Sequence, residues 1–179
     1  MAIANYISRK RQAEIDEKLA EIKLTTNKTY PENDVIDIIK AYIPNVEVVE
    51  HSFFGDHKTR GAVYKKSELF KQPMIVVQKA LTKEGKTFTL AHEFGHYCLD
   101  HIGSANFFFD NASFDGSKRM QKEAEAQYFA ASLLMPEDEF LQLMEFLNIK
   151  ELAKRFGVSE SAAKVRKAWL DGRAAKRSL

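Results

Sequence analysis

Apolar residues recur at helical spacing in the first quarter of the chain, and this pattern predicts two amphipathic helices. From residue 8 to about residue 24, Ile15, Leu19 and Ile22 stand among charged residues, as in a helix with a polar outer face. Pro31 suits the first turn of a second helix, because proline is favoured there. The apolar stripe of that second helix consists of Val35, Ile38, Ile39 and Tyr42.

Three segments rich in β-branched and aromatic residues come next and predict a small three-stranded sheet. The middle segment is polar enough for an edge strand, which would either pair with an extended peptide substrate or be blunted by its lysines. Residues 83–86 are expected to form the turn into the following helix. The three predicted strands are Val46 to Phe54, Ala62 to Phe70 and Pro73 to Ala80.

The helix that follows carries a His-Glu-x-x-His motif from His92 to His96. On a helix the two histidines share one face, so both imidazoles can reach a single metal ion. Glu93, beside the first histidine, can then approach a water molecule on that ion. The flanking residues are largely apolar, and histidines in a packed helix need polar partners. The motif therefore favours a zinc hydrolase over a surface helix with two solvated histidines.

A zinc site of this kind needs a third protein ligand and leaves one position for water. The next predicted helix runs from Lys118 to about Met135, and its acids Glu123 and Glu125 are the candidates. Glu123 shares a face with small and apolar residues, whereas Glu125 lies about 200° around the helix. An inward carboxylate on the Glu123 face would require a cation, so we prefer Glu123 and keep Glu125 as the alternative.

The sequence also predicts the surroundings of several other residues near the motif. Cys98, the single cysteine, lies off the ligand face and is expected to be a small core residue. A loop-like stretch after His101 is rich in phenylalanine, and these side chains would either pack under the loop or line a substrate cleft. They are Phe107, Phe108, Phe109 and Phe114.

The last part of the chain predicts a helix-turn-helix, so we divide the chain into residues 1–140 and 141–179. Gly157 would make the tight turn, and Ser159 would cap the second helix. Outward-facing residues of that helix would be placed for DNA contacts. Many such helix pairs simply pack, and we favour packing here. The outward residues would be Ser161, Lys164 and Lys167.

Charge is distributed unevenly along the 179 residues, whose net charge is +2. From Ile149 onward there are nine basic and three acidic residues, so the preceding part is mildly acidic. A basic end of this kind either contacts nucleic acid or an acidic partner or is a solvated face, and we favour the latter. No stretch is long and apolar enough for a signal peptide or a membrane span, so we expect a cytoplasmic protein without membrane contact.

Three stretches together resemble the ImmA/IrrE family of cytoplasmic metallopeptidases: Phe88 to His101, Glu123 to Pro136 and Leu152 to Ser159. The resemblance implies an α+β fold, namely a zincin-like domain with a small sheet, a His-Glu-x-x-His helix and a third-ligand helix, followed by helix-turn-helix-like helices. It also implies metal ligation by His92, His96 and Glu123, with Glu93 as the catalytic acid-base residue. The expected metal is zinc, with manganese as the second choice.

Similar proteins cut helix-turn-helix repressors, typically of the XRE type, and relieve repression of a mobile element or stress regulon. In the expected mechanism zinc lowers the pKa of its water from ~15.7 toward ~7, while Glu93 moves a proton from that water to the leaving amine. Asp100 and His101 are candidate neighbours of the ligands or of the substrate, and Tyr64 is a candidate oxyanion stabiliser. The alternatives are a DNA-binding regulator with a structural or vestigial metal site and a module that sequesters a repressor without cutting it.

Overall fold

The computed structural model describes residues 7–52, 59–68, 70–102, 107–109 and 116–175. Its first two helices are α1 (Arg9–Thr26) and α2 (Val35–Tyr42). Ile15 and Ile22 of α1 are buried, as the apolar spacing predicts. Pro31 lies in a turn before α2, so its predicted place in the first helical turn is wrong. Asp34 begins α2 instead, because its side chain accepts a hydrogen bond from the backbone of Ile36.

The sheet has four strands, in the order β1-β3-β2-β4. The three predicted strands are present as β1 (Glu47–His51), β2 (Gly61–Tyr64) and β3 (Met74–Gln78). The fourth strand, β4 (Phe107–Phe109), comes from the stretch expected to be a loop, while Phe114 lies outside the described residues. β1 runs parallel to β3, and β2 is antiparallel to both of its neighbours. β2 is thus an interior strand, and its predicted edge position is wrong.

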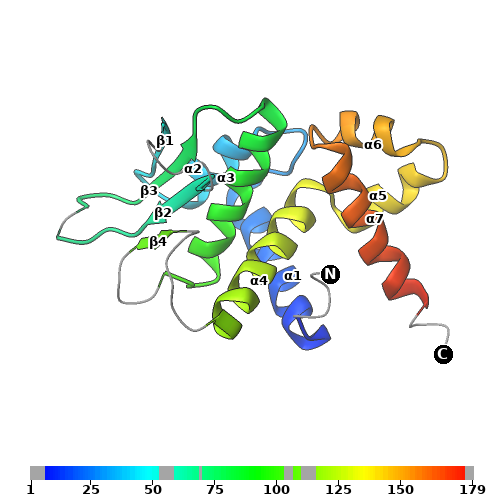
Figure 1. The fold of residues 1–179 in the computed structure, drawn as a ribbon, viewed down its shortest axis with the longest axis horizontal. Coiled ribbons are helices and arrows are strands. Elements are labelled where there is room, and N and C mark those ends of the chain that lie inside the picture. Colours follow the sequence, from blue (N-terminus) through cyan, green and yellow to red (C-terminus); the bar gives the residue numbers. More distant parts are fainter. Residues whose placement is uncertain (1–6, 53–58, 69, 103–106, 110–115, 176–179) are drawn as a thin grey trace.

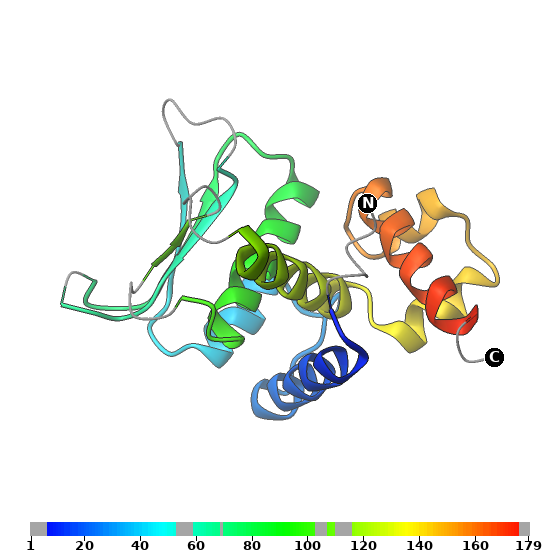
Figure 2. The same ribbon diagram turned by 60° about the horizontal axis from the view of Figure 1, so that its bottom comes forward.

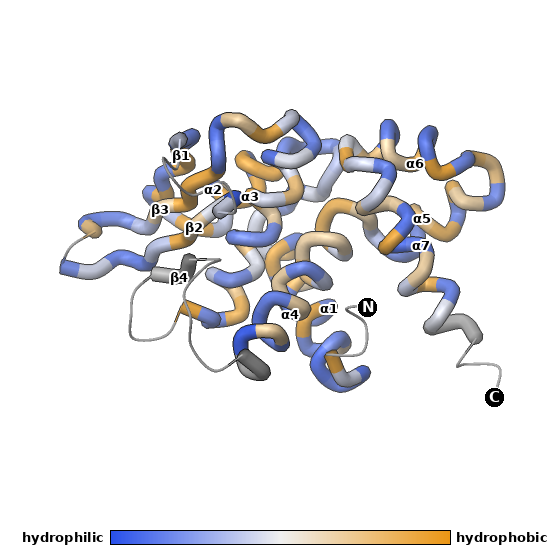
Figure 3. The backbone as a smooth tube through the Cα atoms, viewed as in Figure 1, coloured by the Kyte–Doolittle hydropathy of each residue, from blue (hydrophilic) through white to orange (hydrophobic). Residues whose placement is uncertain are grey.

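The sheet packs against α3 (Lys83–Cys98), which lies between the sheet and α4 (Gly116–Leu134) in both Figure 1 and Figure 2. Thr82 caps α3, so residues 83–86 form its first helical turn and not the turn that the sequence predicts. A Cβ added at Gly95 would lie 3.0 Å from the ring of Phe129, so the two helices approach closely there. Figure 3 shows hydrophobic positions along the sheet, α3 and α4, and mainly hydrophilic ones along α1.

Three C-terminal helices complete the fold: α5 (Glu137–Met144), α6 (Ile149–Arg155) and α7 (Glu160–Ala175). Gly157 makes the turn between α6 and α7 with a φ of +55°, which favours glycine. Arg166 of α7 is buried and donates hydrogen bonds to the Met135 carbonyl and the Ser132 hydroxyl, at the end of α4. The division at residue 140 stays a prediction. Among the described helices, none is both long enough and apolar enough to cross a bilayer.

Candidate metal centre

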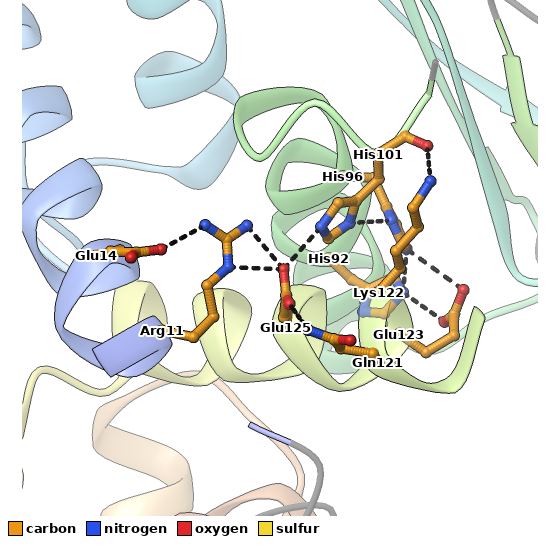
Figure 4. A network of polar contacts seen from close by, with 9 residues as sticks. All are labelled: Arg11, Glu14, His92, His96, His101, Gln121, Lys122, Glu123 and Glu125. Carbon is orange, nitrogen blue, oxygen red and sulfur yellow. Dashed lines mark hydrogen bonds and ion pairs between the residues drawn. The ribbon is translucent and has the colours of Figure 1, made fainter. Parts of the chain in front are cut away.

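The packing of α3 against α4 brings the two histidines of the motif to Glu123. His92 Nε2 lies 3.0 Å from His96 Nε2 and 3.2 Å from Glu123 Oε2. His96 Nε2 lies 3.5 Å from Glu123 Oε1. In Figure 4 the three side chains point toward one another from the two helices. Each residue offers one ligand atom, and these three atoms lie within 4.8 Å of one another, so one ion can contact all three residues.

The distances and the chemistry of this cluster fit a tetrahedral divalent ion. Bonds of about 2.0–2.1 Å at tetrahedral angles would separate two ligand atoms by about 3.3 Å, close to the observed spacing. Two imidazoles and a carboxylate are also a ligand set that catalytic zinc sites use. Oε1 of Glu123 is buried without a hydrogen-bond partner among the described residues, and a cation would satisfy it. The residues therefore fit a bound zinc ion.

Electrostatics keeps the cluster in a form that can bind a cation. Burial lowers the pKa of His96 to about 3, since a buried imidazolium would lose its hydration. For Glu123, burial opposes ionisation, but the polar interactions with His92 and His96 outweigh it and hold the pKa of the carboxyl below its usual value. A neutral imidazole and an ionised carboxylate are the states in which these groups bind metals.

Glu93 lies under β2, outside the ligand cluster. Its side chain is only 3% exposed and packs against Gly61, where an added Cβ would lie 2.7 Å from Oε1 of Glu93. The absence of a side chain at Gly61 therefore makes room for the carboxylate. In the sequence Gly61 directly precedes a predicted strand and has a plain explanation as a turn residue, although glycine in a strand often marks the close approach of another group.

Tyr64, at the other end of β2, is close enough to Glu93 for the two to interact electrostatically. Burial, and then the charge of Glu93, raise the pKa of the Tyr64 hydroxyl, so the hydroxyl keeps its proton at neutral pH. The Tyr64 ring also packs on Phe70, with 4.6 Å between ring centroids. The candidate oxyanion stabiliser thus lies on the same strand as the glycine that accommodates Glu93.

The other residues that the sequence suggests as neighbours of the metal or as ligands differ in position and burial. His101 is buried beside His96, with 2.9 Å between their Nδ1 atoms. Asp100 is exposed and pairs with Lys65, so it does not join the ligand cluster. Cys98 packs against the hydrophobic core, and burial raises its pKa. Glu125, the alternative third ligand, is directed away from the cluster toward Arg11, a residue that the sequence analysis does not single out.

A cavity of about 410 Å³ is lined by residues of α3, α4 and α7. Phe88, one helical turn before His92, and Gln127, one turn after Glu123, both line it. Val165 and Trp169 of α7 also line it, which gives the cavity an apolar character.

A mixed sheet packed on a helix with two histidines one turn apart, with a glutamate from the next helix beside them, defines a zincin-like domain. Residues 43–167 match the model of the M78 peptidase family, described as the IrrE N-terminal-like domain, and the chain belongs to this family. This confirms the predicted ImmA/IrrE membership and the zincin-like α+β fold. The family implies a divalent metal, and His92, His96 and Glu123 form a candidate site for it.

A curated relative is the radiation response metalloprotease IrrE of Deinococcus radiodurans. It is 34% identical to this chain over 97 residues, which cover 50% of this chain and 29% of the relative. The chain thus spans less than a third of the length of that relative.

Proposed function

We propose that this chain is a zinc-dependent endopeptidase that hydrolyses a peptide bond in a regulatory protein, with a helix-turn-helix repressor of the XRE type as the substrate class. The observation that carries the activity is the convergence of His92, His96 and Glu123, together with the burial of Glu93, which follows His92 in the chain. Zinc is the proposed metal because it commonly takes two imidazoles and a carboxylate. Membership in a peptidase family adds support for the reaction class.

The metal and the residues around it would have different roles in hydrolysis of the peptide bond. When bound, zinc supplies Lewis acidity, which activates a water molecule and polarises a carbonyl group. The Glu93 carboxylate takes a proton from the attacking water as its oxygen bonds to the carbonyl carbon. When the C–N bond breaks, Glu93 passes that proton to the leaving nitrogen. Tyr64, which stays protonated, donates its O–H to the carbonyl oxygen as negative charge develops there.

The cavity between α3, α4 and α7 is the place we propose for a substrate side chain. Phe88 and Gln127 link it to the two ligand-bearing helices, at one turn from His92 and Glu123. Its apolar lining favours an apolar substrate residue next to the scissile bond.

The position of α7 supports a peptidase over a DNA-binding regulator. In a DNA-binding helix-turn-helix, the first residues of the second helix contact base edges. Here Ser161, in the first turn of α7, lines the cavity together with Phe88 of α3.

The test compares the wild type with Glu93→Gln and His92→Ala. Metal content is measured by mass spectrometry on protein purified without a metal-affinity tag. Cleavage is measured on a panel of intact purified XRE-type repressors and on a proteome-derived peptide library. We expect about one zinc per chain in the wild type and in Glu93→Gln, cleavage by the wild type alone, and neither zinc nor cleavage for His92→Ala.

Two results would contradict the proposal. One is a wild-type protein that takes up no metal even after zinc is supplied. The other is cleavage by Glu93→Gln at the wild-type rate, because the carboxylate would then have no part in proton transfer. An intact repressor in a stable complex with both the wild type and Glu93→Gln would favour the sequestering alternative.

A further inference from the structure

We propose that His101, Glu125 and Arg11 form a positioning relay that fixes the tautomer and orientation of the ligand His96. Helix α1, which carries Arg11, would then contribute to metal binding. The inference rests on the proposed metal site and concerns residues that do not bind the metal themselves. Figure 4 shows the relay as a continuous chain of contacts that starts at His96 and ends on α1.

The hydrogen-bond geometry at His101 determines which ring nitrogens carry hydrogen. His101 Nε2 lies 3.1 Å from Oε2 of Glu125, and an ionised carboxylate only accepts hydrogen bonds, so Nε2 is the donor. In a neutral His101 the Nδ1 atom is then an acceptor. It lies 2.9 Å from His96 Nδ1, which must therefore donate. This leaves His96 Nε2 without hydrogen and able to bind a metal through its lone pair.

Arg11 supplies the positive charge that lets a buried carboxylate stand at the end of the relay. Glu125 is only 4% exposed, and both Nε and Nη2 of Arg11 donate to its Oε2, at 3.0 and 2.8 Å. The other oxygen, Oε1, accepts from Gln121 at 2.9 Å. Since Arg11 already balances the carboxylate, a further positive charge on His101 would be costly in this buried place. The ion pair thus supports the neutral His101 that the tautomer assignment requires.

Two hydrogen bonds of its backbone hold His101 in position between His96 and Glu125. Its N–H donates to the carbonyl of His96 at 3.0 Å, and its own carbonyl accepts from Lys122 Nζ at 2.9 Å. Lys122 precedes the ligand Glu123, so α4 fixes the position of His101 as well as contributing the third ligand. The His101 ring is therefore held from its backbone, from Glu125 and from His96.

The anchor of the relay lies outside the residues that define the family. The family model matches residues 43–167, whereas Arg11 belongs to α1. A second contact holds α1 on α4, since the Tyr128 hydroxyl donates to Asp16 at 3.0 Å. We infer that displacing α1 would free Glu125 and, through His101, loosen His96.

The test measures zinc affinity by competition with a chromophoric chelator. Arg11→Met removes the anchor, and His101→Phe keeps the ring volume but removes both ring nitrogens. Loss of such outer contacts to a ligand typically weakens metal binding by about 10–100-fold. We expect about 10-fold for Arg11→Met, which acts through two intermediates, and 10–100-fold for His101→Phe. Lys18→Met is the matched control, because it removes a cation of α1 that pairs only with Glu21 of the same helix among the contacts described.

A spectroscopic readout separates positioning from loss of structure. Long-range 1H–15N correlation spectra of the zinc-loaded protein report which imidazole nitrogen carries hydrogen. We expect Nδ1–H for His96 and Nε2–H for His101. Circular dichroism confirms that each variant is folded, and Arg11→Met, at a partly exposed position, keeps the test valid should His101→Phe fail to fold.

The outcomes distinguish the relay from the metal centre itself. Zinc binding by Arg11→Met and His101→Phe within threefold of the wild type, or Nδ1–H on His101, would overturn the relay and leave the metal centre standing. If the wild type binds no better than His92→Ala, the metal centre fails, and the relay fails with it.

Discussion

The close contact between Gly61 and Glu93 allows the role of Glu93 to be tested without changing Glu93. In Gly61→Ala the new methyl group would lie 2.7 Å from Glu93 Oε1 and 2.7 Å from Thr89 Cγ2. Ordinary contact begins at 3.4 Å, so each distance is about 0.7 Å too short. Gly61 pairs with Val77 in the sheet, which holds the strand backbone in place. We therefore expect the Glu93 carboxylate to move.

The expected cost follows from the size of this displacement. A misplacement of about 1 Å in a catalytic group can cost about 100-fold in rate. At 1.36 kcal/mol per factor of ten, this is about 2.7 kcal/mol of transition-state stabilisation. Zinc content should not change, because His92, His96 and Glu123 are not among the nearest neighbours of the added methyl group. Gly61→Ala should thus retain its metal and lose about 100-fold in kcat/KM.

The assay measures the rate of cleavage of a substrate identified with the wild type, alongside zinc content and the urea midpoint. Gly172→Ala is the matched control, since an added Cβ there meets nothing within 4 Å, and we expect full activity from it. If Gly61 acts through Glu93, adding Gly61→Ala to Glu93→Gln should cause little further loss. Activity of Gly61→Ala within threefold of the wild type, with zinc bound, would refute this reasoning.

Three further predictions concern stability. In metal-free protein, His96 has a folded-state pKa of about 3 against 6.5 for the free side chain, so the unfolded state binds more protons and stability falls as pH drops below 6.5. We expect a loss of about 2 kcal/mol between pH 7 and pH 5 in urea titrations, and a smaller slope in His96→Ala. Zinc at about 100 times its Kd should stabilise the wild type and Glu93→Gln by about 2.7 kcal/mol, but not His92→Ala, as read from thermal unfolding. Asn148→Ala removes the capping box of α6 and should cost about 1 kcal/mol in urea titrations, with cleavage unchanged.

The features that sequence could predict depend on contacts between near neighbours along the chain. The helices follow from apolar spacing, and the pairing of His92 with His96 follows from the helical repeat alone. The preference for Glu123 over Glu125 also rests on helical geometry, because only one of them shares the small-residue face of α4. In the structure Glu123 lies beside the two histidines, while Glu125 faces α1.

The order of the strands depends on contacts that sequence patterns do not encode. β4 pairs with β2 across more than forty residues, and this pairing makes β2 an interior strand. The lysines that suggest an edge, Lys65 and Lys66, follow the last residue of the strand. The same arrangement places Gly61 over Glu93. A glycine next to a strand has a plain local explanation as a turn residue, so its contact with a helix becomes visible only when the sheet and α3 are assembled.

Arg11 is a second example of a contact that the sequence does not reveal. In the sequence it looks like a surface charge, but in the structure it is part of the surroundings of the proposed metal centre. In sequence it lies on the polar face of an amphipathic helix, with Glu14 one turn away as a local partner. Its contact with Glu125 joins residues that are 114 positions apart. The two acids of α4 nevertheless indicate that positively charged partners must be near, because a buried carboxylate on either face of the helix needs a cation. Glu123 meets that need through the metal cluster and Glu125 meets it through α1, so the two acids of one helix link the N-terminal helix to the ligands of the proposed zinc site.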